Sequence, residues 1–311
     1  SGLALILALG VALRMGFSLD LPRYDKFGHD VDGHVAYVNY IAEHRAVPSV
    51  DDCWTCYHPP VYYALSVPVW KAGEALGISG ASALNAESFV LSVALLLLGF
   101  AFFSNVLKGA PLACATVLLA FWPMLLLAAP RIGNDQMFYV LHALCLWLGV
   151  KYLKGGRGKY ILAAAVVTAL AYWTKSTGLV TVGTWVLFAA LGYVNNARTL
   201  KLQKTEIAGW LFFVMTVAAI LILKLTGDAS LVGNESGLHS GLRVGNAAAN
   251  YLFFDLKTFI VEPYTSPWQD ELGRQYFWNY ALKSSLFGEF KLLQRGAGSL
   301  LATLCSMSFL W

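Results

Sequence analysis

The sequence predicts an all-α membrane protein with about eight transmembrane helices. Hydrophobic residues make up 58% of the 311 residues and charged residues only 13%, and the mean hydropathy is +0.59. A soluble domain typically carries about 25% charged residues. The apolar residues also gather into runs of roughly 20, the length that crosses a bilayer. These runs are 1–19, 86–106, 111–129, 135–153, 159–175, 177–194, 207–225 and 293–311.

The first apolar run, 1–19, and the stretch "VYYALSVPVW" could each be interpreted in two ways. We interpret 1–19 as the first span rather than a signal peptide, because no small-residue cleavage site follows it. The stretch 61–70 is apolar for only ten residues before Lys71 and Glu74 interrupt it. We therefore predict an interfacial or re-entrant helix over 61–77, not a span.

The charge distribution predicts which loops face the cytoplasm. With 61–77 kept out of the membrane, three basic loops without acidic residues fall on one side, and positively charged loops are typically cytoplasmic. The first outer loop 20–85 and the segment 227–291 are then extracytoplasmic. The basic residues are Lys108, Lys151, Lys154, Arg157, Lys159, Arg198, Lys201 and Lys204.

Three regions follow from this topology. We expect a transmembrane module over 1–226, an extracytoplasmic loop with interfacial character over 227–291, and a final, incomplete span over 292–311. The net charge of +4 is small and no basic patch occurs, so the bilayer is an expected partner and nucleic acid is not.

Acidic side chains open the first outer loop. Asp30 and Asp32 precede a short amphipathic helix. Its spacing of three and four puts one set of side chains on a single face: His34, Tyr37, Ile41 and His44. Either aspartate could simply cap this helix. One cap is needed, however, and two aspartates are present.

Two further polar points occur at outer helix ends. Arg131, Asn134 and Asp135 lie in "APRIGND" at the mouth of the fourth span, and Lys175 lies in "TKSTG" between two apolar runs. Asp135 could simply be a helix cap. Lys175 and Arg14 could simply extend toward the lipid headgroups and have no other role. Taken together, the groups of the outer face predict a site where helix ends converge.

The pair Cys53 and Cys56 precedes Tyr57 and His58 in "CWTCYHPP". Cysteine and histidine are preferred zinc ligands, but two cysteines form only half of a structural site. In an oxidising compartment a disulfide is the competing interpretation. We therefore predict no metal ligands among the candidate site residues.

The chain resembles the C-type multi-span glycosyltransferases, in particular relatives of the dolichyl-phosphate-mannose protein mannosyltransferases and of the lipid A aminoarabinose transferase. The resemblance rests on "HVAYVNYIAEHRAVP", "YHPPVYYAL", "RIGND" and "TKSTG", and covers about residues 10–200. It implies a polyprenyl- or dolichyl-phosphate sugar as donor, an acceptor hydroxyl on a protein, lipid or glycan, and an extracytoplasmic active site.

The resemblance also implies roles for the candidate residues. An acidic pair in the first outer loop activates the acceptor in that family, and either Asp30 or Asp32 matches it, with Val31 where Glu is usual. Asp135 matches a second acidic residue that orients the sugar, the acceptor or a divalent cation. The remaining candidates would bind the substrate: His34, Tyr57, His58, Arg131, Asn134 and Lys175.

We therefore predict a base-assisted displacement at the anomeric carbon with inversion. Arg131, Lys175 and His58 would neutralise the leaving phosphate. Two other classes remain as alternatives: a multi-span transporter, which would carry ionisable groups near the bilayer midplane, and a non-catalytic membrane scaffold.

Overall fold

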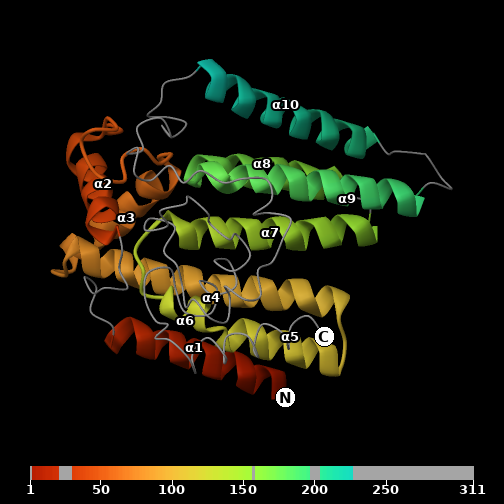
Figure 1. The fold of residues 1–311 in the computed structure, drawn as a ribbon, viewed down its shortest axis with the longest axis horizontal. Coiled ribbons are helices and arrows are strands. Elements are labelled where there is room, and N and C mark those ends of the chain that lie inside the picture. The colour runs from red at the N-terminus through yellow and green to blue at the C-terminus, as the bar shows by residue number, and fades with distance from the viewer. Residues whose placement is uncertain (1, 21–29, 156–157, 197–203, 227–311) are drawn as a thin grey trace, which may run out of the picture. The chain divides into compact units, whose positions relative to one another are not determined.

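A computed structural model of the chain describes residues 2–20, 30–155, 158–196 and 204–226. These ranges contain helices and no β-strand (Figure 1), which confirms the all-α prediction for this part of the chain. The predicted segments 227–291 and 292–311 lie outside the described residues. The helices are α1 (Gly2–Asp20), α2 (Val31–His44), α3 (Val61–Ala75), α4 (Gly80–Val106), α5 (Ala110–Phe121), α6 (Pro123–Leu127), α7 (Asn134–Gly155), α8 (Gly158–Thr174), the 3₁₀ helix η1 (Ser176–Leu179), α9 (Val180–Asn196) and α10 (Lys204–Thr226).

Four of the described helices are long and apolar enough to cross a membrane. Their bounds are Gly2–Leu19, Gly80–Val106, Asn134–Gly155 and Lys204–Leu223. At about 1.5 Å per residue, 18 residues extend roughly 27 Å, close to the hydrocarbon thickness of a bilayer. The described part of the chain is therefore compatible with an integral membrane protein. The other predicted spans are shorter helices here, except 293–311, which lies outside the described residues.

The prediction of one continuous span over 111–129 is wrong. The helix α5 stops at Phe121, and a separate short helix, α6, starts at Pro123. Proline has no backbone N–H and clashes with the preceding turn, so a helix that meets it ends or kinks. The 12 residues of α5 extend only about 18 Å, too short to cross a bilayer by themselves.

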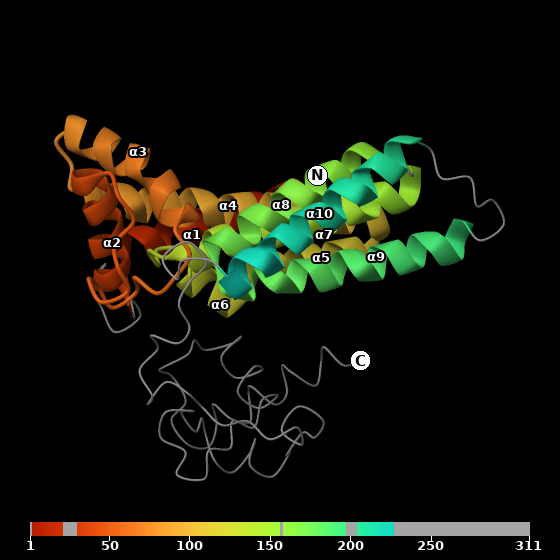
Figure 2. The same ribbon diagram turned by 90° about the horizontal axis from the view of Figure 1, so that it is seen from above.

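All described helices except α6 belong to one compact unit, and α6 falls into a second one. Within the first unit, α4 packs against α1 and α7, and α8 packs against α7 and α10 (Figure 1). The helices α2 and α3 lie together at the end where α4 and α7 begin and α8 ends (Figure 2). The basic residues lie toward the opposite end: Lys108 follows α4, Lys154 lies in the last turn of α7, and Lys159 lies in the first turn of α8.

The two helices of the predicted first outer loop form as expected. On α2, His34 and Tyr37 are buried, whereas His44, at the end of the helix, is exposed. The helix ends there because Arg45 takes a left-handed conformation (φ 54°), which closes helices in this way. On α3, Tyr62 and Tyr63 are fully buried and join the same apolar cluster as Tyr37.

Arg14 is fully buried in the first predicted span, which excludes the interpretation that it extends to headgroups. Its Nη1 donates to the carbonyls of Gly10 at 3.0 Å and Ala120 at 2.8 Å, and its Nη2 donates to the carbonyl of Leu119 at 3.1 Å. Its Nε donates to Ser92 Oγ at 3.0 Å. One guanidinium thus joins α1, α4 and α5.

The end of α5 explains why a cation sits there. The last four carbonyls of a helix have no partner within the helix, and Pro123 has no N–H to offer the carbonyl of Leu119. Unsatisfied carbonyls are costly inside a membrane, and the C-terminal end of a helix favours positive charge. A β-carbon added to Gly10 would lie 2.9 Å from Ala120 Cβ, so glycine permits this close approach.

We predict that Arg14→Met lowers the free energy of unfolding by about 2 kcal/mol, because it strands buried carbonyls. Ser92→Ala removes one bond and should cost about 1 kcal/mol or less. Thermal unfolding of the detergent-solubilised protein measures both. The control is Leu13→Val, since Leu13 is exposed on the same helix. Equal stability of Arg14→Met and the control would contradict this role.

Candidate functional site

An ion pair between Asp135 and Lys175 joins the start of α7 to the residue that follows α8. The two side chains are 25% and 24% exposed. Next to it, Asn134 Nδ2 donates to the carbonyl of Thr174 at 3.0 Å. The predicted convergence of "RIGND" and "TKSTG" is therefore present: Asn134 and Asp135 bind neighbouring residues of the other segment.

The residues before α7 are fixed by side chains from both sides. Asn85 of α4 donates to the carbonyl of Pro130 at 2.7 Å, and Gln136 donates to the carbonyl of Ala128 at 2.7 Å. Ile132 is 1% exposed and belongs to the cluster under α2 and α3. This anchoring holds the first turn of α7 against the helices of the predicted outer loop.

The helix after Lys175 is held by an equally close contact. The N–H of Lys175 bonds to the carbonyl of Ala171 at 3.0 Å, and a β-carbon added to Gly178 would lie 2.4 Å from the Ala171 carbonyl. Because only glycine fits at that distance, η1 folds back on the end of α8. Lys175 is thereby kept at the helix junction beside Asp135.

His34 and His58 stand beside this ion pair. Their rings are stacked with centroids 5.8 Å apart. The Nδ1 of His34 lies 2.8 Å from the Tyr63 hydroxyl. A β-carbon added to Gly133 would lie 3.1 Å from His34 Nε2, so the imidazole packs on the backbone directly before Asn134.

Both imidazoles are neutral near pH 7. Burial lowers the pKa of His34 well below its ordinary value, and the charge of His58 adds to this effect. Burial and then the positive charge of Lys175 lower the pKa of His58 to about 3, while Asp135 opposes the shift. Arg131 acts on His34 in the same direction as Lys175. These mutual effects indicate that the five side chains form one electrostatic cluster.

Asp30 does not cap α2. Its side chain makes no capping bond, and its backbone is left-handed, with φ 64°. The Nε1 of Trp54 instead donates to Asp30 Oδ1 at 2.7 Å. A non-glycine residue in this conformation is uncommon, although Asp tolerates it better than most, and such residues gather at functional sites.

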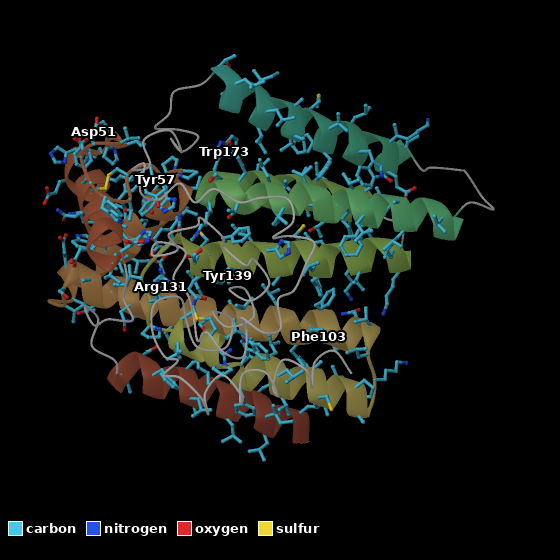
Figure 3. All side chains as sticks on the ribbon, viewed as in Figure 1. Asp51, Tyr57, Phe103, Arg131, Tyr139 and Trp173 are labelled. Atoms are coloured by element: carbon cyan, nitrogen blue, oxygen red, sulfur yellow. A yellow bond between two sulfur atoms is a disulfide. The ribbon has the colours of Figure 1, made fainter. Side chains whose placement is uncertain are left out.

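The remaining candidates take different places. Asp32 is exposed in the first turn of α2, where a carboxylate favours the helix dipole. Tyr57 and Arg131 are partly buried and lie at the end of the unit where α2 and α3 meet (Figure 3). The ring of Tyr57 is 4.1 Å from that of His58, centroid to centroid.

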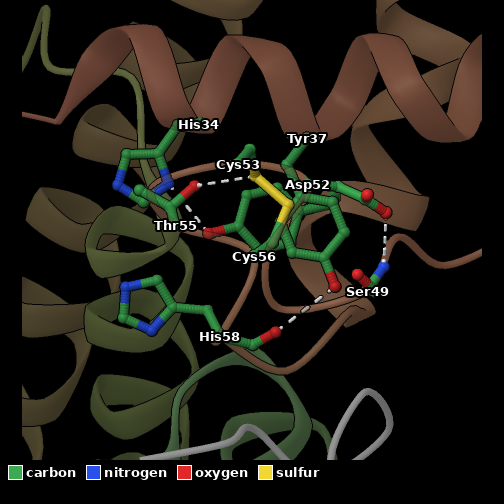
Figure 4. Close-up of a disulfide and its surroundings, with 9 residues drawn as sticks. His34, Tyr37, Ser49, Asp52, Cys53, Thr55, Cys56 and His58 are labelled. Atoms are coloured by element: carbon green, nitrogen blue, oxygen red, sulfur yellow. Dashed lines mark hydrogen bonds between the residues drawn. A yellow bond between two sulfur atoms is a disulfide. The ribbon is translucent and has the colours of Figure 1, made fainter. Parts of the chain in front are cut away.

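Cys53 and Cys56 form a disulfide, so the interpretation as half of a zinc site is wrong (Figure 4). Within the described ranges, no three side chains of His, Cys, Asp or Glu come together in a way that could hold a metal ion.

Sequence reasoning missed two residues at this site. Tyr63 was not singled out although it bonds to His34, and Trp54 was not singled out although it bonds to Asp30. These pairs are 29 and 24 residues apart, and no local pattern links them.

Two buried oxygens beside the ion pair have no hydrogen-bond partner among the described residues: Asn134 Oδ1 and Thr174 Oγ1. Buried polar atoms are normally satisfied by protein or by bound water.

Comparisons of the chain with protein-family models, with curated proteins and with solved structures gave no match.

We predict that stability falls as the pH is lowered from about 6.5 toward the pKa of His58. The histidines ionise near pH 6.5 when unfolded and only at lower pH when folded, so protons bind preferentially to the unfolded chain in this window. Each of the two histidines should lower the free energy of unfolding by up to about 1.4 kcal/mol per pH unit in this window, because the unfolded chain then binds one proton more at that residue. Unfolding measured between about pH 4.5 and 7.5 gives the slope.

The substitution His58→Gln should flatten this slope. The matched control is His44→Gln, since His44 is exposed and lies outside the cluster. The same slope in His58→Gln and in the unaltered protein would refute the assignment.

Proposed function

We propose that the chain is a membrane glycosyltransferase that transfers a sugar from a polyprenyl-phosphate donor to an acceptor hydroxyl, with inversion at the anomeric carbon. The observation that carries the proposal is the cluster of Arg131, Asp135, Lys175, His34 and His58 at one end of apolar helices. A lipid-linked donor keeps its chain in the bilayer and its phosphate at the interface, so its enzyme needs charged groups at one membrane face.

The charge of the cluster suits such a donor. With both imidazoles neutral, Arg131 and Lys175 face the single carboxylate of Asp135, and the five side chains carry a net positive charge. The phosphodiester of the donor carries one negative charge, and the leaving phosphate gains another. Fixed cations near the leaving oxygen stabilise that developing charge.

Each residue then has a role in the displacement. The carboxylate of Asp30 takes the proton of the acceptor hydroxyl, whose oxygen attacks the anomeric carbon. The bond from that carbon to the phosphate oxygen breaks, and its electron pair leaves with polyprenyl phosphate. Lys175 can donate to the phosphate while it bonds Asp135, because an ammonium group has three N–H donors. His58 donates a hydrogen bond rather than a charge, since its pKa is about 3.

The structure favours Asp30 over Asp32 as the base. Asp30 is held in a left-handed conformation and by the Trp54 indole, whereas Asp32 is exposed on the first turn of α2. Catalytic groups need a fixed geometry, and a solvated side chain on a helix surface has none.

The transporter alternative needs ionisable groups that serve a pathway through the membrane. Arg14 is such a group by position, but its guanidinium is committed to carbonyls of α1 and α5 and to Ser92. Those bonds give it a structural role. The scaffold alternative would leave Asp30, Asp135 and Lys175 apart from one another. The direct pairing of Asp135 with Lys175 supports a site over a scaffold for two of these three groups.

We predict that Asp30→Asn lowers sugar transfer by about 10²- to 10⁴-fold, the usual contribution of a general base. Asp32→Asn should have a much smaller effect. The assay follows release of polyprenyl phosphate from a panel of radiolabelled polyprenyl-phosphate sugars by the protein in lipid nanodiscs. The control is Glu43→Gln, because Glu43 is an exposed carboxylate of α2 that accepts a bond from Asn39. Unchanged turnover in both aspartate variants would end the proposal that a first-loop aspartate is the base.

The proposed orientation has its own test. Positions 71 and 108 lie on either side of α4 (Gly80–Val106), a helix of 27 residues, or roughly 40 Å at 1.5 Å per residue. A single cysteine at Lys71 should therefore react with a membrane-impermeant thiol reagent added to intact cells. A single cysteine at Lys108 should react only after the membrane is permeabilised. A background with Cys114→Ser and Cys305→Ser removes the exposed free cysteine of the described residues and the one cysteine outside them. Labelling of both positions from the same side would refute the topology.

A further inference from the structure

The disulfide between Cys53 and Cys56 encloses Trp54 and Thr55, and Trp54 reaches from this ring to Asp30. The ring is closed a second time by the N–H of Cys56, which bonds to the carbonyl of Cys53 at 3.2 Å. Trp54 is 45% exposed, so burial in the core does not set its position. The ring that carries Trp54 and its 2.7 Å bond to the Asp30 carboxylate both restrain the indole.

We propose that Trp54 is a positioning residue for Asp30. The Cys53–Cys56 disulfide keeps Trp54 in the position from which its indole bonds to the Asp30 carboxylate. The effect on turnover rests on the proposed function, whereas the physical link between Trp54, the disulfide and Asp30 does not. The indole holds one carboxylate oxygen of Asp30 and so restrains the orientation of the carboxylate. Aiming of this kind matters because small displacements of a catalytic group cost rate steeply.

The ring is docked firmly on the start of α2. Thr55 is fully buried, and a β-carbon added to Gly33 would lie 2.7 Å from Thr55 Cγ2. Cys56 is 1% exposed and belongs to the same apolar cluster as Tyr37 (Figure 4). Because Thr55 and Cys56 are packed closely against the protein, Trp54 is carried by a ring whose other half is buried.

The same loop also places His58. The N–H of His58 bonds to the carbonyl of Thr55 at 3.0 Å, and the carbonyl of His58 accepts the Tyr37 hydroxyl at 3.3 Å. One disulfide-closed turn therefore orients groups on two sides of the proposed site, the carboxylate of Asp30 and the imidazole of His58.

Opening the ring should release this alignment. A dithiol reductant would supply two electrons and two protons, the sulfur–sulfur bond would break into two thiols, and the reductant would become a disulfide. The segment from Cys53 to Cys56 then regains conformational freedom. The Trp54 indole is no longer held where it bonds to the Asp30 carboxylate. The activity should accordingly depend on an oxidising compartment.

The first experiment needs no assay of activity. The protein is labelled with 5-fluorotryptophan and studied by ¹⁹F NMR in detergent, and the Trp54 resonance is assigned by its loss in Trp54→Phe. We expect Asp30→Asn and reduction by a water-soluble phosphine each to shift that resonance and to leave most other tryptophan resonances in place. A Trp54 resonance that responds to neither would overturn the proposal.

The second experiment measures turnover with the donor found above. We expect Trp54→Phe and the double variant Cys53→Ser/Cys56→Ser to lower kcat by about tenfold to a hundredfold with little change in the donor KM. Cys114→Ser, which alters an exposed free cysteine, is the control and should keep full activity and the same response to reductant. A rise in KM with unchanged kcat would overturn the positioning role. Absence of transfer in the unaltered protein would instead refute the proposed function and leave the NMR result standing.

Discussion

The junction of α7 and α8 is the constraint on which the site depends. Asp135 pairs with Lys175 and Asn134 bonds to the carbonyl of Thr174, so two helix ends that carry the polar residues are fixed to one another. His34 reaches the same junction from α2 and packs on Gly133. Breaking one member of a partly buried ion pair leaves the other uncompensated, which costs more than losing both. The pair therefore stabilises the junction and also limits how the side chains at the site can rearrange.

An otherwise apolar chain uses its few charges in two different ways. The guanidinium of Arg14 donates hydrogen bonds to carbonyls of α1 and α5 and to Ser92, and the side chain is fully buried at the end of α5. Lys175 keeps a quarter of its surface exposed beside Asp135. An ion whose bonding capacity is used within the protein is structural, whereas one with capacity and access left can bind a ligand. Arg14 and Lys175 therefore differ in how much of their bonding capacity and surface remains available.

Local patterns predicted the helices well and their ends less well. Runs of apolar residues located α1, α7 and α10 to within a few residues, and the short helix α3 followed from Lys71 and Glu74. The same signal overran Pro123, because hydrophobicity does not register a missing N–H. At the site, the polar composition of "RIGND" and "TKSTG" predicted their meeting. The bonds of Trp54 to Asp30 and of Tyr63 to His34 could not be predicted, since they depend on tertiary packing.

The neutral imidazoles shape how the cluster can act. Burial keeps both histidines uncharged near pH 7, so the charge available to a ligand is set by Arg131, Lys175 and Asp135 alone. A bound phosphate would share the ammonium of Lys175 with Asp135 rather than displace it, because each of its N–H groups can serve a different acceptor. Histidines that stayed protonated would add positive charge beside Lys175 and weaken the packing against Gly133. Their burial thus keeps the positive charge of the cluster low enough for the helix ends to stay together.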